Sequence, residues 1–454
     1  MPIESSTPIG GFEGSQVGRQ SGGDVLRDRV IRDEIHKDIL VPAHIVTIID
    51  TREIQRLRFI QQLSTCYYVF PAANHSRFIH SLGAYHLAGR LARQLQEVHP
   101  GRLSDDDSEL VQIAALLHDI GHPPYSHLLE NPEVFATFHS HEKWGGMMLE
   151  STKTEVGQAT RAVLGEARFG RLLAIMNGDS QYDGQQIEPF LKEMVSSQLD
   201  VDRMDYLLRD QANSGAQIGG FDIDRVLRAL RVDDDGHLYI MSWGLPAIEA
   251  YLVCRFHMYQ QVYFHKVNLL TQSYLTRMLA RARVLYQLGE LELDTGLKDM
   301  LTNSNLDVLS YSRLTDADVQ VAMTHWAEHA DGELSGLASK MLSRRGFHKS
   351  LRIDGMTDEM AQKLVEPLSG LLEDAGFIPA DDLIIASISK RGYLPYSEGI
   401  LLPDGRDVSE ASPLIRSLIE LDSRVLVFVP EPIRDEAELK ARDIVRPVQS
   451  RLDV

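Results

Sequence analysis

Apolar residues recur at helical spacing through most of the chain, in stretches separated by polar and glycine-containing segments. The clearest of these stretches are 45–63, 79–95, 110–117 and 246–284. The stretch 246–284 predicts one long helix. The run 110–117 is apolar on nearly every side, which is typical of a buried helix. Ser104, with Asp107 at the capping-box position, predicts its start, and Gly121 as a C′ residue predicts its end.

Two regions depart from the helical pattern. Residues 29–41 alternate between apolar and polar side chains, which predicts a short strand or hairpin. After further helices over 287–370, the runs 383–388 and 425–430 predict two strands, and a helix of about 435–445 follows them. The pattern therefore predicts a mainly α protein, with a helical core and a small α+β lobe at its C-terminal end.

Length and composition suggest how this fold is divided. The chain has 454 residues, enough for a large core and more than one lobe. Residues 1–24 are rich in Gly, Ser and Pro and are expected to be a disordered leader. The remaining units are expected to be a core, a helical extension and the C-terminal lobe, at 25–290, 291–375 and 376–454.

Composition and charge exclude some classes of protein. The chain is 43% hydrophobic and 24% charged, without a long apolar stretch or a secretory signal, so we expect a cytoplasmic protein with no membrane partner. Its two cysteines, Cys66 and Cys254, do not form a disulfide framework. A net charge of −19 argues against a nucleic-acid partner. It does not exclude a polyphosphate substrate held by a few arginines and a metal.

A histidine-rich stretch follows the apolar run 110–117 and holds His118, Asp119, His122 and His127. Imidazole nitrogen and carboxylate oxygen are both metal ligands. A structural His-Asp pair at a helix end is the ordinary alternative, but three histidines and an aspartate this close together favour a metal site. His80 lies on or beside the apolar stripe of the stretch 79–95; alone it would be a core histidine, and with His118 and Asp119 it becomes a candidate ligand.

The segment 199–210 is the second candidate for chemistry. If it is helical, the spacing places Asp202, Tyr206, Arg209 and Asp210 on one face. One of its aspartates would complete a metal site with two histidines and two aspartates. A solvated charged face is the ordinary alternative here, as it is for Arg52, Arg56 and Arg58.

The order of His80, His118-Asp119 and an aspartate of 199–210 resembles the HD-domain superfamily of metal-dependent phosphohydrolases. More closely, the chain is similar to the deoxynucleoside triphosphate triphosphohydrolases, and most similar to their vertebrate SAM-and-HD-domain members, here without the SAM domain. The resemblance covers about residues 29–290. The segments that carry it include Gln55–Arg58, Tyr67–Pro71, Arg77–Gly83, His118–His127, Asp200–Tyr206 and His265–Val267.

The resemblance implies a divalent metal (Mn, Fe, Mg or Zn) bound by His80, His118, Asp119 and Asp202. Catalytic roles around the α-phosphate are implied for His122, His127 and His141. Contacts to substrate are implied for Gln62, Leu63, Arg77, Arg203, Tyr206, Asp210, Arg255 and Tyr263. A regulatory nucleotide is expected at Arg29, Asp50, Gln55, Arg58, His265 and Lys266. The chain departs from the family where it has Glu34, Lys37 and Ile79 in place of Pro, Gly and Glu.

The implied reaction converts a dNTP and water into a deoxynucleoside and inorganic triphosphate, with GTP or dGTP as an activator and a dimer or tetramer as the assembly. Water activated at the metal would attack the α-phosphorus, and His127, or else His122, would protonate the departing 5′-oxygen. Two other classes stay open: a nucleotide-sensing regulator with vestigial catalysis, and an HD phosphodiesterase or nuclease.

Overall fold

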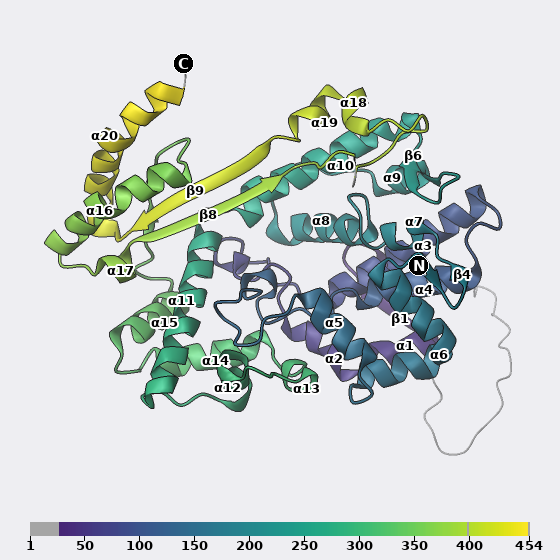
Figure 1. Cartoon of the computed structure of the whole chain (residues 1–454), viewed down its shortest axis with the longest axis horizontal. Helices are drawn as coiled ribbons and strands as arrows, with labels where there is room; N and C mark the ends of the chain where they lie inside the picture. Colours follow the sequence, from purple (N-terminus) through teal and green to yellow (C-terminus); the bar gives the residue numbers. More distant parts are fainter. Residues whose placement is uncertain (1–26, 397–398, 453–454) are drawn as a thin grey trace, which may run out of the picture.

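The computed structural model describes residues 27–396 and 399–452, and the predicted leader 1–24 lies outside this part of the chain. Helices make up most of the described residues, and the strands pair into small antiparallel sheets (Figure 1). The predicted mainly α fold is therefore confirmed. None of the described helices is long and apolar enough to cross a membrane.

The N-terminal half begins with the predicted hairpin, in which β1 (Arg29–Asp33) pairs with β2 (Lys37–Val41). Short helices follow, and then the longer ones that carry the site. Their bounds are α1 (Ala43–Ile49), α2 (Arg52–Arg56), α3 (Arg77–Val98), α4 (Asp105–Leu117), α5 (His141–Glu150), α6 (Glu155–Asn177), α7 (Pro189–Glu193), α8 (Val201–Ser214) and α9 (Ile223–Ala229). Two further hairpins are β3 (Gln181–Tyr182) with β4 (Gln185–Gln186) and β5 (Leu230–Val232) with β6 (Leu238–Ile240).

The second half continues with α10 (Leu245–Met258), α11 (Lys266–Leu288), α12 (Thr295–Thr302), α13 (Val308–Tyr311), α14 (Asp316–Trp326), α15 (Gly332–Ser343) and α16 (Asp358–Asp374). The C-terminal elements are β7 (Lys349–Ser350), α17 (Pro379–Asp382), β8 (Ile384–Arg391), α18 (Val408–Ala411), α19 (Pro413–Ser417), β9 (Leu421–Val429) and α20 (Arg434–Leu452).

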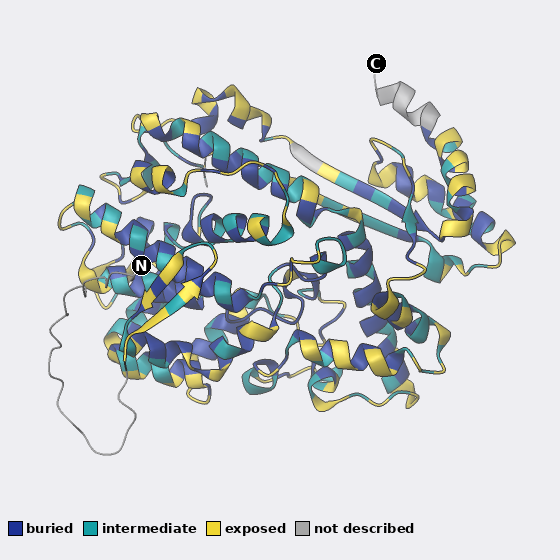
Figure 2. Ribbon diagram, turned by 180° about the vertical axis from the view of Figure 1, so that it is seen from behind, coloured by how far each residue is buried: buried dark blue, intermediate teal, exposed yellow. Residues whose placement is uncertain are grey.

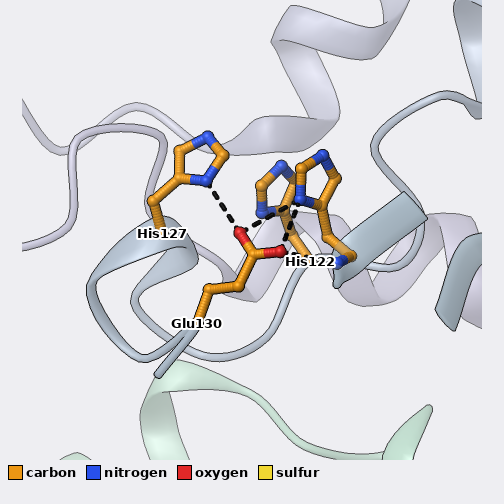
Figure 3. Close-up of side chains that lie close together, drawn as sticks. His122, His127 and Glu130 are labelled. Carbon is orange, nitrogen blue, oxygen red and sulfur yellow. Dashed lines mark hydrogen bonds and ion pairs between the residues drawn. The ribbon is translucent and has the colours of Figure 1, made fainter. Parts of the chain in front are cut away.

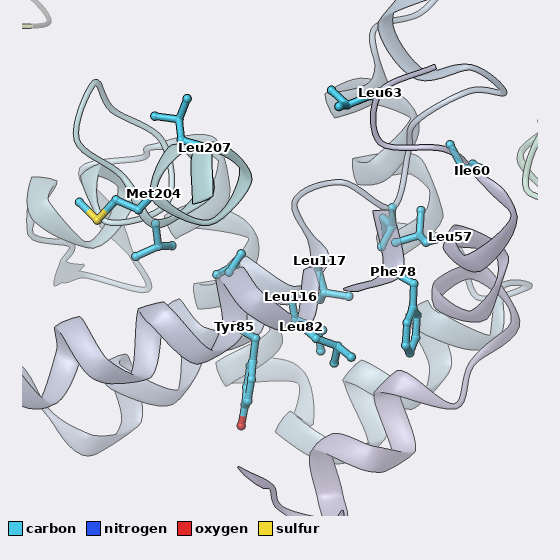
Figure 4. Close-up of a cluster of buried hydrophobic side chains, with 14 of the residues drawn as sticks. Leu57, Ile60, Leu63, Phe78, Leu82, Tyr85, Leu116, Leu117, Met204 and Leu207 are labelled. Atoms are coloured by element: carbon cyan, nitrogen blue, oxygen red, sulfur yellow. The ribbon is translucent and has the colours of Figure 1, made fainter. Parts of the chain in front are cut away.

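A buried apolar core joins α3, α4 and α8 (Figure 4). Leu82 of α3, Leu116 and Leu117 of α4, and Met204 and Leu207 of α8 are all nearly or fully buried. Each such side chain contributes about 1.5–3 kcal/mol of hydrophobic stabilisation. Because α3 contacts both α4 and α8, this core fixes the relative positions of the three helices that carry the predicted metal ligands.

Two serines are the N-cap residues of α4 and α5. The Ser104 hydroxyl accepts a hydrogen bond from Asp107 N, so the predicted N-cap of α4 is confirmed. The Asp107 carboxylate binds Arg171 of α6. Ser140 caps α5 in the same way, through Lys143 N.

The end of α4 differs from the prediction. Gly121 does not have the positive φ of a left-handed C′ residue. Its importance lies in close packing instead, because a Cβ there would lie 1.9 Å from His141 O and 2.3 Å from Gly145 N. The segment 118–122, which follows α4, is called the His-Asp loop below. Its backbone thus lies directly against the first turn of α5.

Gly121→Ala is accordingly expected to lower the free energy of unfolding by about 1–3 kcal/mol, because backbone atoms of α5 cannot move aside as a flexible side chain would. Gly146→Ala in α5 is the matched control, since a Cβ there meets nothing within 4 Å. Thermal unfolding followed by circular dichroism measures both variants. Equal stabilities would contradict the close approach.

The long helix predicted over 246–284 is wrong, because the chain forms two helices there. After α10, residues 259–263 form a π-helical turn, and α11 begins at Lys266 with His265 as its N-cap. The His265 ring nitrogen Nδ1 accepts a hydrogen bond from Val267 N at 3.2 Å. Apolar periodicity does not distinguish a π turn from a regular one, and such turns are frequent at functional sites.

Arg56 corrects the interpretation of a solvated basic face. Its guanidinium is buried and donates to the carbonyl oxygens of Leu314, Ile120 and His122 at 2.6, 3.2 and 2.7 Å. The Tyr311 hydroxyl donates to Gly121 O at 2.6 Å. Residues far along the chain therefore hold the backbone of the His-Asp loop in place.

The C-terminal elements contain a second buried apolar cluster. Strand β9 lies between β7 and β8, and it pairs with β8 along their length from Ile384↔Phe428 to Arg391↔Leu421. Helices α16 and α20 pack together beside this sheet. Figure 1 shows the ribbon of β8 and β9 running from these helices toward α10. Figure 2 shows buried residues on the inward sides of the helices and exposed residues facing outward.

Candidate metal centre

Side chains from α3, the end of α4 and the first turn of α8 meet at one point. The Asp202 Oδ1 atom lies 3.1 Å from His80 Nε2 and 3.4 Å from His118 Nε2. The Asp119 carboxylate lies 3.3 Å from His118 Nε2 and 3.6 Å from His80 Nε2. Two imidazole nitrogens and two carboxylates thus face a common centre.

The other nitrogen of each imidazole has a hydrogen-bond acceptor. His80 Nδ1 lies 2.8 Å from Asp205 Oδ2, and His118 Nδ1 lies 2.8 Å from the carbonyl oxygen of Ala115. These acceptors favour the proton on Nδ1, which leaves the Nε2 lone pairs facing the centre. Both Nε2 atoms are buried without a hydrogen-bond partner. Because buried polar atoms are normally satisfied, the donor set fits a divalent metal ion.

The electrostatics of the centre favour a cation. Burial lowers the pKa of His80, but the carboxylates of Asp202 and Asp205 raise it more, to about 10. Burial raises the pKa of Asp202, but His118 and His80 hold it well below its usual range. Asp202 therefore stays ionised in a site that strongly attracts positive charge.

Arg209 does not join Asp202, Tyr206 and Asp210, so that part of the α8 prediction is wrong. It is fully buried and donates to both oxygens of Asp205 at 2.9 Å and to Asp33 at 2.8 Å. His36 of the hairpin turn also bonds Asp205, at 2.7 Å. Asp205 and His36 were not identified from the sequence, although the spacing of Asp205 and Arg209 is that of a helical ion pair.

A second cluster, of His122, His127, Glu130 and His141, adjoins the centre (Figure 3). The rings of His122 and His141 stack at 4.0 Å between centroids, with 11° between their planes. The Glu130 carboxylate bonds Nδ1 of His127 at 2.9 Å and Nδ1 of His141 at 3.0 Å. His122 Nε2 lies 3.1 Å from Asp119 Oδ1, which connects the two clusters.

Glu130 is a candidate site residue that sequence reasoning missed. Burial raises its pKa, but His127 and His141 together lower it well below the ordinary range of a glutamate. The carboxylate is therefore ionised and orients both rings. Nothing in the local pattern of residues 128–135 distinguishes this glutamate from a surface one.

A cavity of about 830 Å³ opens above both clusters. This volume falls within the range of small-molecule sites. Most residues predicted to contact substrate line it: Gln62, Leu63, Arg77, Arg203, Tyr206, Asp210 and Tyr263. Tyr259 of the π turn also lines the cavity, as do Lys192, Ile388 and Lys390, which the sequence did not single out.

The charged residues of the wall are held in place. Arg77 donates to Asp119 and Ser126, and Arg203 donates to Asp200 and to the carbonyl oxygen of Ser197. On the other side of the cavity, Asp210 accepts a hydrogen bond from the Tyr263 hydroxyl at 2.7 Å and pairs with His75 at 2.8 Å.

Arg255 is the remaining residue predicted to contact substrate. It is only 5% exposed, and its Nε and Nη1 atoms are buried without a hydrogen-bond partner. Its guanidinium lies 5.9 Å from the centre of the Tyr259 ring. Buried N–H groups without an acceptor are costly, so an anion is expected to approach this guanidinium.

The predicted regulatory residues form separate groups. Arg29 makes two hydrogen bonds of 2.6 Å to Asp50. Arg58 donates to the side chain of Gln55 at 2.7 Å and lies over the ring of Phe78. His265 and Lys266 stand at the start of α11, where His265 serves as the N-cap. Asp50 also lines a shallow pocket with residues of α6, among them Glu155 and Gln158.

Comparison with known proteins agrees with this geometry. Residues 77–210 match the HD domain family, and residues 221–366 match a family described as the HD associated region. The uncharacterized protein YwfO of Bacillus subtilis is 34% identical over 383 residues, which cover 83% of this chain and 83% of that protein. The deoxynucleoside triphosphate triphosphohydrolase SAMHD1 of Homo sapiens is 34% identical over 316 residues, covering 63% of this chain and 49% of the human protein.

A crystal structure of a phosphohydrolase from Bacteroides thetaiotaomicron matches with a TM-score of 0.75 and 29% identity, over 89% of this chain and 100% of that one. The matched range 77–210 contains the four predicted ligands His80, His118, Asp119 and Asp202. The chain belongs to the HD-domain family of metal-dependent phosphohydrolases.

Proposed function

We propose that the protein hydrolyses deoxynucleoside triphosphates to a deoxynucleoside and inorganic triphosphate. The observation that carries this proposal is one cavity in which the metal centre, the Glu130-bound histidine cluster and the side chains of Gln62 and Leu63 meet. The similarity to SAMHD1, whose name states this activity, supports it.

Each group has a role in this reaction. A divalent ion held by the two histidines and two aspartates would supply Lewis-acid chemistry at the α-phosphate. Arg77, fixed by Asp119 and Ser126, is placed to donate to the phosphate oxygens. His127 faces the cavity with its Nδ1 held by Glu130, so its Nε2 can donate a proton to the departing 5′-oxygen.

Gln62 and Leu63 are proposed to select the sugar. Both line the cavity, and the Gln62 Oε1 atom is buried without a hydrogen-bond partner. An amide there would bond the 3′-hydroxyl, while the apolar Leu63 leaves a 2′-hydroxyl without a partner. Deoxynucleotides are therefore expected to be better substrates than ribonucleotides.

Anion-exchange analysis of the products tests the proposal. Full-length protein is incubated with each dNTP and Mn²⁺ or Mg²⁺, with and without GTP and with EDTA as the metal-removal control. Deoxynucleoside plus triphosphate, lost with EDTA, is the expected result. Pyrophosphate plus monophosphate would mean cleavage at a different bond. Tight dNTP binding without any product would instead favour the nucleotide-sensing regulator.

The comparison with GTP also tests the regulatory proposal, in which a guanine nucleotide binds near Asp50 and Gln55 and promotes a dimer or tetramer. Light scattering with and without GTP measures the assembly. An unchanged rate and an unchanged mass would remove the activator and leave the hydrolase proposal intact.

Glu130→Gln is expected to lower kcat by roughly tenfold or more, because general acid catalysis contributes about 10²–10⁴-fold and depends on the orientation of His127. Glu133→Gln, an exposed glutamate of the same loop, is the matched control. Steady-state kinetics measures both variants. A Glu130→Gln enzyme as fast as the control would show that Glu130 does not position the acid.

A further inference from the structure

Strand β8 brings the C-terminal elements to the wall of the cavity. Ile384 and Ala386 pack on the main core, whereas Ile385 packs on the second cluster with α16 and α20. Because alternate residues of a strand point to the same side, Ile388 and Lys390 also face the main body. Both line the cavity, as Tyr259 of the π turn 259–263 does. More than 120 residues of the chain separate this turn from Ile388.

The ribbon of β8 and β9 is attached to the rest of the protein at two points, one at the level of Ile388 and one just before β8. Arg424 of β9 donates to the carbonyl oxygen of Gln260 in the π turn at 3.1 Å. Before β8, Asp382 pairs with His348 at 3.1 Å, and the other nitrogen of that ring bonds the Tyr274 hydroxyl of α11 at 2.5 Å. These contacts set the position of β8 relative to the cavity.

Lys390 and Arg255 approach the same aromatic ring. The Lys390 Nζ atom lies 5.6 Å from the centre of the Tyr259 ring, and the Arg255 guanidinium lies 5.9 Å from it. The Nε and Nη1 atoms of Arg255 are buried without a hydrogen-bond partner. Burial raises the pKa of Tyr259, but Arg255, Lys390 and Arg203 together lower it below its ordinary value. Three cationic side chains therefore act on the Tyr259 ring, which lines the cavity.

We propose that Lys390 is a phosphate-binding residue contributed by the C-terminal elements, and that it and Arg255 hold the far end of a polyphosphate chain whose near end lies at the metal centre. This inference rests on the proposed function. It adds the expectation that the site binds a triphosphate more tightly than a monophosphate. In this proposal a single phosphate at the metal centre does not reach Lys390, whereas the far end of a chain of three does.

Calorimetric titration with inorganic tripolyphosphate and with orthophosphate tests the proposal. The protein is full length and loaded with Mn²⁺, with unbound metal removed. Lys390→Gln is expected to weaken tripolyphosphate binding roughly tenfold and to leave orthophosphate binding unchanged. Lys390→Arg keeps the charge and should bind within about threefold of the wild type. Arg391→Gln, the same charge change on the opposite face of β8, should have no effect.

Equal tripolyphosphate binding by Lys390→Gln and Arg391→Gln would overturn the inference, as would an equal loss for both anions. The outcome is separate from that of the product analysis. If no dNTP is hydrolysed but Lys390→Gln still loses tripolyphosphate selectively, the proposed reaction fails and the polyphosphate site stands. If dNTPs are hydrolysed and Lys390→Gln binds tripolyphosphate normally, the reaction stands and the inference fails.

Discussion

Asp202→Ala is expected to abolish hydrolysis, with a loss well beyond the roughly 10–100-fold that follows removal of groups around a metal's ligands. Asp202 Oδ1 is the atom that both imidazoles approach, so its removal takes away one ligand and most of the charge that attracts the cation. The side chain is part of the first turn of α8 and is 28% exposed, so the helix itself should survive.

Metal content, activity and thermal unfolding are measured on the same preparation. Asp106→Ala is the control, because that carboxylate is 76% exposed and makes only a surface ion pair of 3.4 Å. Low metal content together with near-normal stability would fit the assignment. Retained activity with one bound metal ion would remove Asp202 from the ligand set.

Asp205→Ala is expected to lower the free energy of unfolding by about 3–5 kcal/mol, because it leaves the fully buried Arg209 without its main partner. It also removes the acceptor of His80 Nδ1 and the partner of His36. The variant should therefore lose both stability and metal affinity, or fail to fold. Chemical denaturation measures the first quantity and metal titration the second.

Two further variants separate these effects. Glu34→Ala removes the half-exposed carboxylate that binds the same guanidinium, and it should cost less than about 1 kcal/mol. Asp205→Asn keeps the shape of the side chain and should fold well enough for a metal titration, with affinity reduced by about 10–100-fold. Unchanged metal affinity in Asp205→Asn would show that Asp205 serves Arg209 alone.

The sequence predicted the hairpin, the helix from 105 to 117 and the strands near the C-terminus, and it marked His118 and Asp119 as candidate metal ligands. These predictions depend on local patterns, which short-range physics largely decides. Which aspartate of 199–210 completes the centre could not be read from the residues themselves. Asp202 and Asp205 both contact the His80 ring, one at Nε2 and the other at Nδ1, and only the packing of α3 against α8 shows which of them faces the centre.

The errors also have a common physical origin. Arg56 was interpreted as solvated, and Arg209 was placed on the face of Asp202. Both have buried acceptors that are distant in the sequence, a carbonyl of Leu314 for Arg56 and Asp33 for Arg209. Lys390 was not considered for a similar reason. Its position beside Tyr259 depends on how β8 and β9 pack against the helical core. Contacts between distant segments cannot be inferred from spacing or composition.

The hydrogen bonds from Arg56 and Tyr311 to the His-Asp loop bear on how the enzyme matures during synthesis. All four predicted metal ligands have emerged from the ribosome once residue 202 is made, yet Leu314 and Tyr311 follow more than 100 residues later. Because chains fold progressively from the N-terminus, the loop would stay unsupported until that segment arrives. A fragment ending at residue 290 would then hold every ligand and still lack the support that keeps them in register. The segment with Tyr311 and Leu314 thus supports the candidate metal centre without supplying any of its predicted ligands.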